Sequence, residues 1–202
     1  DTLTPGTPGY VGTKAKDPSL LLDDKGQALF RSGVGTLLYL TKHSRPDITN
    51  AVRELSKTMG FATQCQFNEM IRVIKFVLKS KGLGLRVNPV YKEFIWYLKA
   101  LSDSDFANDS DTRISVFGYI VYFLGVPVSW KSKGMRSVVL STTEAEYVAV
   151  SEVVKEISFL VQLLQTMDIE VELPVEVYVD NIGAIWLANN QTTSERTKHV
   201  DI

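Results

Sequence analysis

The sequence predicts an α/β fold with a mixed sheet and flanking helices, preceded by a small, mainly helical segment. Two observations lead to this prediction. Apolar residues recur at helical spacing early in the chain, whereas short β-rich runs and a long amphipathic helix occupy the rest. The pattern changes near residue 90. We therefore expect an extended lead-in over 1–27, a helical segment over 28–90 and an α/β domain over 91–202.

The lead-in and the helical segment are distinguished by turn chemistry and by periodicity. Residues 1–27 contain Pro, Gly and Lys with little to bury, so they are expected to be extended. Helices are expected over 28–41, where Phe30, Val34 and Leu37 share a face, and over 46–60, where Pro46 suits the first turn. A third, strongly amphipathic helix is expected to follow, with apolar residues from Phe67 to Leu78.

The second half of the chain alternates strands and helices. We expect strands over 83–87, 93–101, 115–124 and 127–131, the last two joined by a tight connection at Gly125-Val126. A long helix over 142–167 comes next, and a strand over 175–179 and a short helix over 182–190 follow it. This order is typical of an α/β domain with a mixed sheet.

Composition indicates a globular protein, because 45% of the 202 residues are hydrophobic and 22% are charged. No apolar run is long enough for a transmembrane span, and the polar start does not fit a signal peptide. The single cysteine, Cys65, excludes an internal disulfide and a cysteine-based zinc cluster. We therefore expect an intracellular protein, cytoplasmic or nuclear, with no membrane partner.

The net charge of -1 hides an uneven distribution. Residues 1–90 carry 13 Lys and Arg against 7 Asp and Glu, a balance of +6, and the remaining residues carry 9 against 16, a balance of -7. A basic segment beside an acidic one suits a bound polyanion and bound metal ions. Two ordinary solvated surfaces would give the same counts.

Glu146 is the most informative acidic residue. Steps of three and four from Glu146 lead to Val150, Val153 and Ile157, the apolar stripe that must face the sheet. A carboxylate on such a stripe is costly unless a hydrogen-bond donor or a cation meets it. The alternative is a carboxylate near the helix start that the helix dipole favours.

Further acids stand at the ends of two predicted strands. Asp180 follows the strand over 175–179, and it could instead cap the next helix. Asp103 and Asp105 are two residues apart, so they share a face and periodicity cannot choose between them. Acids at two strand ends and on the inner face of the intervening helix can converge at one sheet edge. Such a group favours Mg²⁺ or Mn²⁺ with oxygen ligands.

Several strings resemble the ribonuclease H domain of copia-type retroelements. They are LSDSDFANDSDTRISVFGYIVYFLGVPVSWKSK, LSTTEAEYVAVSEVVKEISFL, VEVYVDNIGAIWLANN and RTKHVDI. FRSGVGTLLYLTKHSRPDITNAVRELSKTM is similar to the reverse transcriptase thumb and connection region that precedes this domain in the same polyproteins. The resemblance covers roughly residues 28–202 and implies a ribonuclease H-like mixed sheet.

The resemblance also implies a chemistry and its residues. The family's catalytic acids fall on Asp103, Glu146 and Asp180, which would hold two Mg²⁺ or Mn²⁺ ions and hydrolyse the RNA strand of an RNA–DNA hybrid. The expected partners are the hybrid and the remainder of the reverse transcriptase. Candidate duplex contacts, each of which could also be a plain solvated side chain, are Lys131, Lys133, Arg136, Asn181, Arg196, Lys198 and His199.

Two departures from the family pattern limit the expected activity. The chain has no Y-x-D-D motif, so we expect no polymerase activity. The family's fourth catalytic acid would follow Ile202, and Asp201 resembles an earlier helix instead, so this domain is expected to be incomplete at its C-terminus. Whether the chain is active by itself is thus left open. The alternative function is a non-catalytic nucleic-acid-binding or interaction fragment of a degenerate or captured retroelement.

Overall fold

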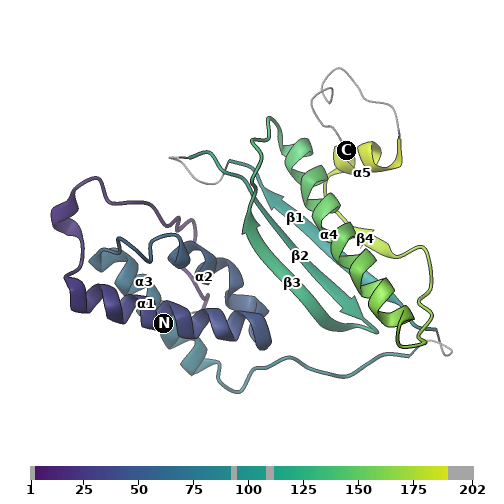
Figure 1. Ribbon diagram of the computed structural model, residues 1–202, viewed down its shortest axis with the longest axis horizontal. Helices are drawn as coiled ribbons and strands as arrows, with labels where there is room; N and C mark the ends of the chain where they lie inside the picture. Colours follow the sequence, from purple (N-terminus) through teal and green to yellow (C-terminus); the bar gives the residue numbers. More distant parts are fainter. Residues whose placement is uncertain (1–2, 92–94, 108–111, 191–202) are drawn as a thin grey trace. The chain divides into compact units, whose positions relative to one another are not determined.

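The computed structural model describes residues 3–91, 95–107 and 112–190, and it divides into two compact units, 1–85 and 86–202 (Figure 1). The first unit is helical and the second contains the sheet. None of the helices in the described ranges combines the length and the apolar character that a membrane span requires.

Three α-helices form the first unit: α1 (Asp24–His43), α2 (Thr49–Ser56) and α3 (Gln64–Lys79). Helix α1 starts four residues before the predicted position, because the side chain of Asp23 caps it by accepting the Gly26 N–H at 2.8 Å. A short 3-10 turn, Pro46–Ile48, precedes α2. The helices enclose a core of Phe30, Val34, Leu37, Ile48, Val52, Leu55, Ala62, Met70 and Val73.

The residues before α1 contain one 3-10 turn, Pro18–Leu20, in the described part of the chain, and residues 3–13 are held against the helices. We call residues 3–13 the N-terminal strap. Glu69 of α3 accepts the backbone N–H of Thr7 at 2.6 Å and its hydroxyl at 2.8 Å. Glu54 of α2 accepts the N–H of Gly12 at 2.8 Å. Two glutamates thus anchor the strap to two different helices.

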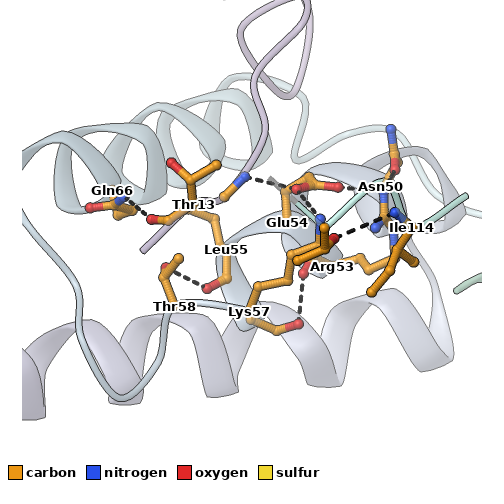
Figure 2. A network of polar contacts seen from close by, with 12 residues as sticks. Thr13, Asn50, Arg53, Glu54, Leu55, Lys57, Thr58, Gln66 and Ile114 are labelled. Atoms are coloured by element: carbon orange, nitrogen blue, oxygen red, sulfur yellow. Dashed lines mark hydrogen bonds and ion pairs between the residues drawn. The ribbon is translucent and has the colours of Figure 1, made fainter. Parts of the chain in front are cut away.

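Glu54 sits at the centre of the polar network in Figure 2. Its side chain is 4% exposed, and it pairs with Lys57 at 2.9 Å and with Arg53 at 2.5 Å. Figure 2 also shows Gln66 donating to the carbonyl oxygen of Thr13 at 3.2 Å. The chain itself therefore supplies the cations and the N–H donor that this buried carboxylate needs.

The second unit contains a mixed sheet of β1 (Leu98–Asp105), β2 (Val116–Phe123), β3 (Val126–Gly134) and β4 (Glu176–Tyr178). The order is β3-β2-β1-β4, with β1 antiparallel to β2, β2 antiparallel to β3, and β4 parallel to β1. The parallel pairing requires a crossover between β3 and β4, and the chain makes it with a long helix.

That crossover helix is α4 (Thr142–Gln165), and a short helix, α5 (Ile182–Asn189), follows β4 (Figure 1). Helix α4 packs on one face of the sheet. The buried core between them consists of Leu98, Ala100, Phe117, Tyr119, Val121, Met135, Val139, Ala145, Ala149, Val153 and Ile157. The predicted fold class is confirmed: the protein is α/β, with a mixed sheet and flanking helices consistent with a ribonuclease H-like fold.

Several further details differ from the sequence prediction. Residues 83–87 form no strand; Leu83 and Val87 are 68% and 75% exposed, because no strand in the described part of the chain pairs with the segment and covers its apolar side chains. The hairpin turn lies at Leu124-Gly125, where both residues have positive φ, and Val126 already pairs in β3. Strand β1 runs over Leu98–Asp105 instead of the predicted 93–101, and β3 continues to Gly134, beyond the predicted end at residue 131.

Candidate metal centre

Asp103 lies within β1 on a central strand of the sheet. It is exposed, and its pairing partner in β2 is Gly118, which has no side chain. A Cβ atom built on Gly118 would be 3.5 Å from the nearest atom, the carbonyl oxygen of Lys131. A Cβ atom at Gly118 would therefore make only an ordinary van der Waals contact, and Gly118 itself places no side chain beside Asp103.

Glu146 lies in the second turn of α4, whose start is fixed by local hydrogen bonds. The Ser141 side chain accepts the N–H of Glu144, and the carboxylate of Glu144 accepts the N–H of Leu140 at 2.6 Å. Glu146 is only 5% exposed and lies on the same helix face as the buried Ala149 and Val153. The prediction that Glu146 points inward is confirmed.

Asp180 follows β4 and precedes α5. The parallel pairing of β4 with β1 brings this end of the chain beside β1. The cap of α5 is Asn181, whose side-chain oxygen accepts the N–H of Ala184 at 3.0 Å. The alternative in which Asp180 caps this helix is therefore wrong, and the exposed Asp180 carboxylate is available for another contact.

The three acids converge. Asp103, Glu146 and Asp180 each offer one carboxylate oxygen, and these oxygens all lie within 4.8 Å of one another. Asp105 is not in the group that the described residues form. Three carboxylates at this separation repel one another unless a cation joins them, so the arrangement could hold a metal ion.

The hydrogen bonds and electrostatics of Glu146 fit a cation. Its Oε1 accepts the backbone N–H of Ser104 at 2.9 Å and the Ser104 hydroxyl at 2.8 Å. Its Oε2 is buried and has no hydrogen-bond partner among the described residues. Burial raises the pKa of Glu146, as do the charges of Asp103 and Asp180, whereas the bonds from Ser104 lower it. A divalent cation would satisfy Oε2 and offset the repulsion.

The candidate duplex contacts are distributed differently from the acids. Lys131 and Lys133 are exposed on β3, opposite Tyr119 and Phe117 of β2, and Lys131 lies 5.7 Å from the Tyr119 ring centroid. The pKa of Glu152 is lowered first by its hydrogen bond to Lys155 and further by the charges of Lys131 and Lys133. These two lysines thus lie within electrostatic range of α4.

Of the remaining candidate duplex contacts, two lie within the described residues. Arg136 is exposed after β3, and Asn181 is occupied in part by capping α5. Arg196, Lys198 and His199 lie outside the described residues, as does Asp201.

Sequence reasoning missed the contact of Ser104 with Glu146. Strand alternation would have indicated it, because the residue between Asp103 and Asp105 faces the opposite side of the sheet from both. That side is the one packed by α4, where Glu146 lies.

Comparison with known proteins identifies relatives over almost the whole chain. The retrovirus-related Pol polyprotein from transposon RE2 of Arabidopsis thaliana is 36% identical over 191 residues, which is 95% of this chain and 12% of the relative. The corresponding polyprotein from transposon TNT 1-94 of Nicotiana tabacum is 32% identical over 200 residues, 96% of this chain and 14% of the relative.

A shorter relative also matches. Secreted RxLR effector protein 161 of Plasmopara viticola is 34% identical over 131 residues, 65% of this chain and 90% of the relative. No protein-family model and no solved structure matches the chain.

The chain spans only 12–14% of the polyproteins that it matches across 95–96% of its own length. The recognition made from the sequence motifs is nevertheless confirmed by these relatives. The chain belongs to the retrovirus-related Pol polyproteins of copia-type transposons.

Proposed function

We propose that this chain provides the ribonuclease H function of a retroelement Pol polyprotein, the hydrolysis of the RNA strand of RNA–DNA hybrids during reverse transcription. The observation that supports the proposal is the convergence of Asp103, Glu146 and Asp180 within 4.8 Å. The buried Oε2 of Glu146 adds to it, because no described residue donates a hydrogen bond to this oxygen and the charged groups that act on it are acids. Glu54 Oε1 also lacks a hydrogen bond, but it lies 2.5 Å from the Arg53 guanidinium.

The proposed metals are two Mg²⁺ or Mn²⁺ ions held by these three acids. When bound, they would activate a water molecule and stabilise the leaving oxygen at phosphorus. The chain contributes the placement of its ligands. Asp103 and Asp180 are exposed, so the hybrid backbone can approach them, whereas Glu146 is held from the protein interior by Ser104.

The proposed substrate contacts follow from charge and position. Lys131, Lys133, Arg136 and Asn181 would contact the sugar-phosphate backbone and the 2′-hydroxyls, with little base readout. Arg196, Lys198 and His199 are proposed for the same role. The +6 charge balance of residues 1–90 would add attraction to the duplex, and the remainder of the reverse transcriptase is the proposed protein partner.

Metal binding tests the proposal most directly. We expect Mn²⁺ titration of the full 202-residue chain, followed by the paramagnetic resonance of free Mn²⁺, to show binding. Asp103→Asn, Glu146→Gln and Asp180→Asn should each weaken it by about tenfold or more. Asp105→Asn is the matched control: it removes the same charge from the same strand outside the acidic group, and affinity should persist.

Cleavage of a labelled RNA–DNA hybrid completes the test. Any cleavage of the RNA strand should require Mn²⁺ or Mg²⁺ and should disappear in Glu146→Gln. Mn²⁺ affinity that is the same in wild type, Glu146→Gln and Asp103→Asn would overturn the proposal, because the acids would then not be the ligands.

A second candidate is a non-catalytic interaction fragment. The match to an effector protein along 90% of its length favours it, because this part of the family then also occurs in a short protein. The two candidates differ in one measurement. A fragment of this kind should bind hybrid or protein without Mn²⁺ and should not respond to Glu146→Gln.

A further inference from the structure

Ser104 contacts Glu146 through both of its donors. The backbone N–H and the hydroxyl of Ser104 approach the same oxygen, Oε1, at 2.9 and 2.8 Å. These bonds join the C-terminal end of β1 to the second turn of α4, across 42 positions of sequence. The contact fixes one oxygen of the carboxylate and leaves Oε2 as the oxygen available to a cation.

Two hydrogen bonds to the same carboxylate oxygen restrict the carboxylate more than one bond does. A carboxylate held by a single donor can still rotate about its last side-chain bond, where the torsional preference is broad. Two donors from different directions restrict that rotation, so Oε2 stays in one place. The preorganisation matters because a metal ligand must be held within about 0.5 Å of its productive position.

A substitution at position 104 can remove the hydroxyl bond and leave the backbone bond in place. Any residue except proline can keep the backbone N–H bond, whereas the second bond is made by the side-chain hydroxyl. Ser104 lies directly beside Asp103 in the chain, so the strand that presents one acid also orients another.

We propose that Ser104 is a positioning residue of the metal centre, whose hydroxyl fixes Glu146 Oε1 so that Oε2 is presented to the cation. The inference rests on the proposed function. It adds a residue outside the three acids whose loss should weaken metal binding without removing a ligand.

The test compares side chains that differ only in the hydroxyl. Ser104→Ala should weaken Mn²⁺ binding to the full chain by about tenfold, the low end of the range for an outer-shell partner of a metal ligand. Ser104→Thr should restore affinity to within about twofold of wild type, since its hydroxyl can make the same bond. Ser104→Val has nearly the shape of threonine without the hydroxyl, and it should behave like Ser104→Ala.

Ser102 supplies the matched control on the same strand. It is 6% exposed, it lies two residues before Ser104, and its hydroxyl has no hydrogen-bond partner among the described residues. Ser102→Ala therefore removes a buried hydroxyl from β1 without touching the acids, and Mn²⁺ affinity should be unchanged. Circular dichroism should show that all four variants keep the wild-type fold.

The possible results separate the inference from the proposed function. If wild type binds Mn²⁺ through the three acids but all Ser104 variants bind equally well, the role of Ser104 is overturned and the metal centre stands. If Ser104→Thr fails to restore what Ser104→Val loses, packing explains the loss and the inference also falls. If wild type binds no Mn²⁺, both fall together.

Discussion

Two buried glutamates, one in each unit, are satisfied in opposite ways. Glu54 in the helical unit is 3% exposed as a whole residue, and its neighbours include Lys57 and Arg53 (Figure 2). It also accepts the N–H of Gly12. Glu146 in the α/β unit is 5% exposed, and its neighbours are the two donors of Ser104 and the carboxylates of Asp103 and Asp180.

The difference shows how a structural carboxylate can be told from a ligand. Burial is nearly the same in the two cases, so burial alone identifies neither. What differs is the source of positive charge. The chain supplies it to Glu54, whereas around Glu146 the described neighbours that carry charge are acids. A buried carboxylate that lies among other acids, with one oxygen left without a donor or a cation, is a candidate metal ligand.

Removal of Glu54 should have the largest effect on stability. Glu54→Ala leaves the N–H of Gly12 and two cations without this partner, and we expect a loss of about 3 kcal/mol in the free energy of unfolding. Urea unfolding followed by far-UV circular dichroism measures it. Glu152→Ala is the control: in its pair with Lys155 the side chains are 34% and 69% exposed, so solvent screens the pair and the loss should be below about 1 kcal/mol. Equal losses would contradict the structural role of Glu54.

Gly12 tests the same anchor from the side of the strap. A Cβ atom at Gly12 would lie 2.2 Å from the backbone oxygen of Glu54, so Gly12→Ala must displace the strap and should cost about 2 kcal/mol. Thermal unfolding checks this. Gly35→Ala is matched, because Gly35 lies inside α1 with nothing within 4 Å of the added atom. That change should instead stabilise the protein by about 0.5–1 kcal/mol. A strap that tolerates Gly12→Ala would not be anchored as described.

Glu146→Gln should stabilise the metal-free protein, whereas most substitutions of buried residues destabilise a fold. The pKa of Glu146 is raised in the fold, so the folded chain binds its proton more tightly than the unfolded chain does. Stability without metal therefore falls as pH rises from below the ordinary value of 4.5 through the raised pKa. Near neutral pH, Glu146→Gln should be more stable than wild type by about 1 kcal/mol. Below the ordinary pKa the difference should disappear.

Added metal should make wild type more stable than Glu146→Gln. Added Mn²⁺ should stabilise wild type, since it binds the folded state, and should leave Glu146→Gln almost unchanged. Thermal unfolding with a chelator and with Mn²⁺, over a pH series, provides the measurement. A Glu146→Gln protein that is less stable than wild type without metal would place Glu146 in the same class as Glu54.

Periodicity in the sequence predicted which side of α4 is buried, and hence the inward direction of Glu146. It also predicted the α/β class, because the crossover helix and the strands around it have clear apolar patterns. It could not choose between Asp103 and Asp105, since both point the same way from one strand. That choice depends on where α4 and the end of β4 meet β1, which is set by tertiary pairing.

Other features of the structure have no local pattern in the sequence that would predict them. The anchoring of the strap by Glu54 and Glu69 joins residues 42 and 62 positions apart, and the lead-in itself has only turn chemistry. The strand predicted over 83–87 failed for the opposite reason: β-rich composition was present, but no strand paired with it. Local propensity is overridden wherever backbone partners are missing.

A third glutamate, Glu156 of α4, extends the comparison, with an expected effect on stability no larger than that of Glu146→Gln. Its carboxylate accepts the Tyr119 hydroxyl at 3.1 Å and the Ser129 hydroxyl at 2.7 Å, so neutral donors satisfy it. Burial raises the pKa of Tyr119, and the charge of Glu156 raises it further, which keeps the phenol protonated as a donor.

Tyr119→Phe deletes one of the two donors to the half-buried carboxylate of Glu156 and keeps the other, so we expect a loss of only about 1 kcal/mol in the free energy of unfolding. Chemical denaturation measures that loss, and Mn²⁺ affinity should be unaffected because the acids of the metal centre are not touched. A fall in Mn²⁺ affinity in Tyr119→Phe would mean that the polar contacts along α4 act as one network, and the distinction between structural and ligand glutamates would then have to be drawn for the helix as a whole.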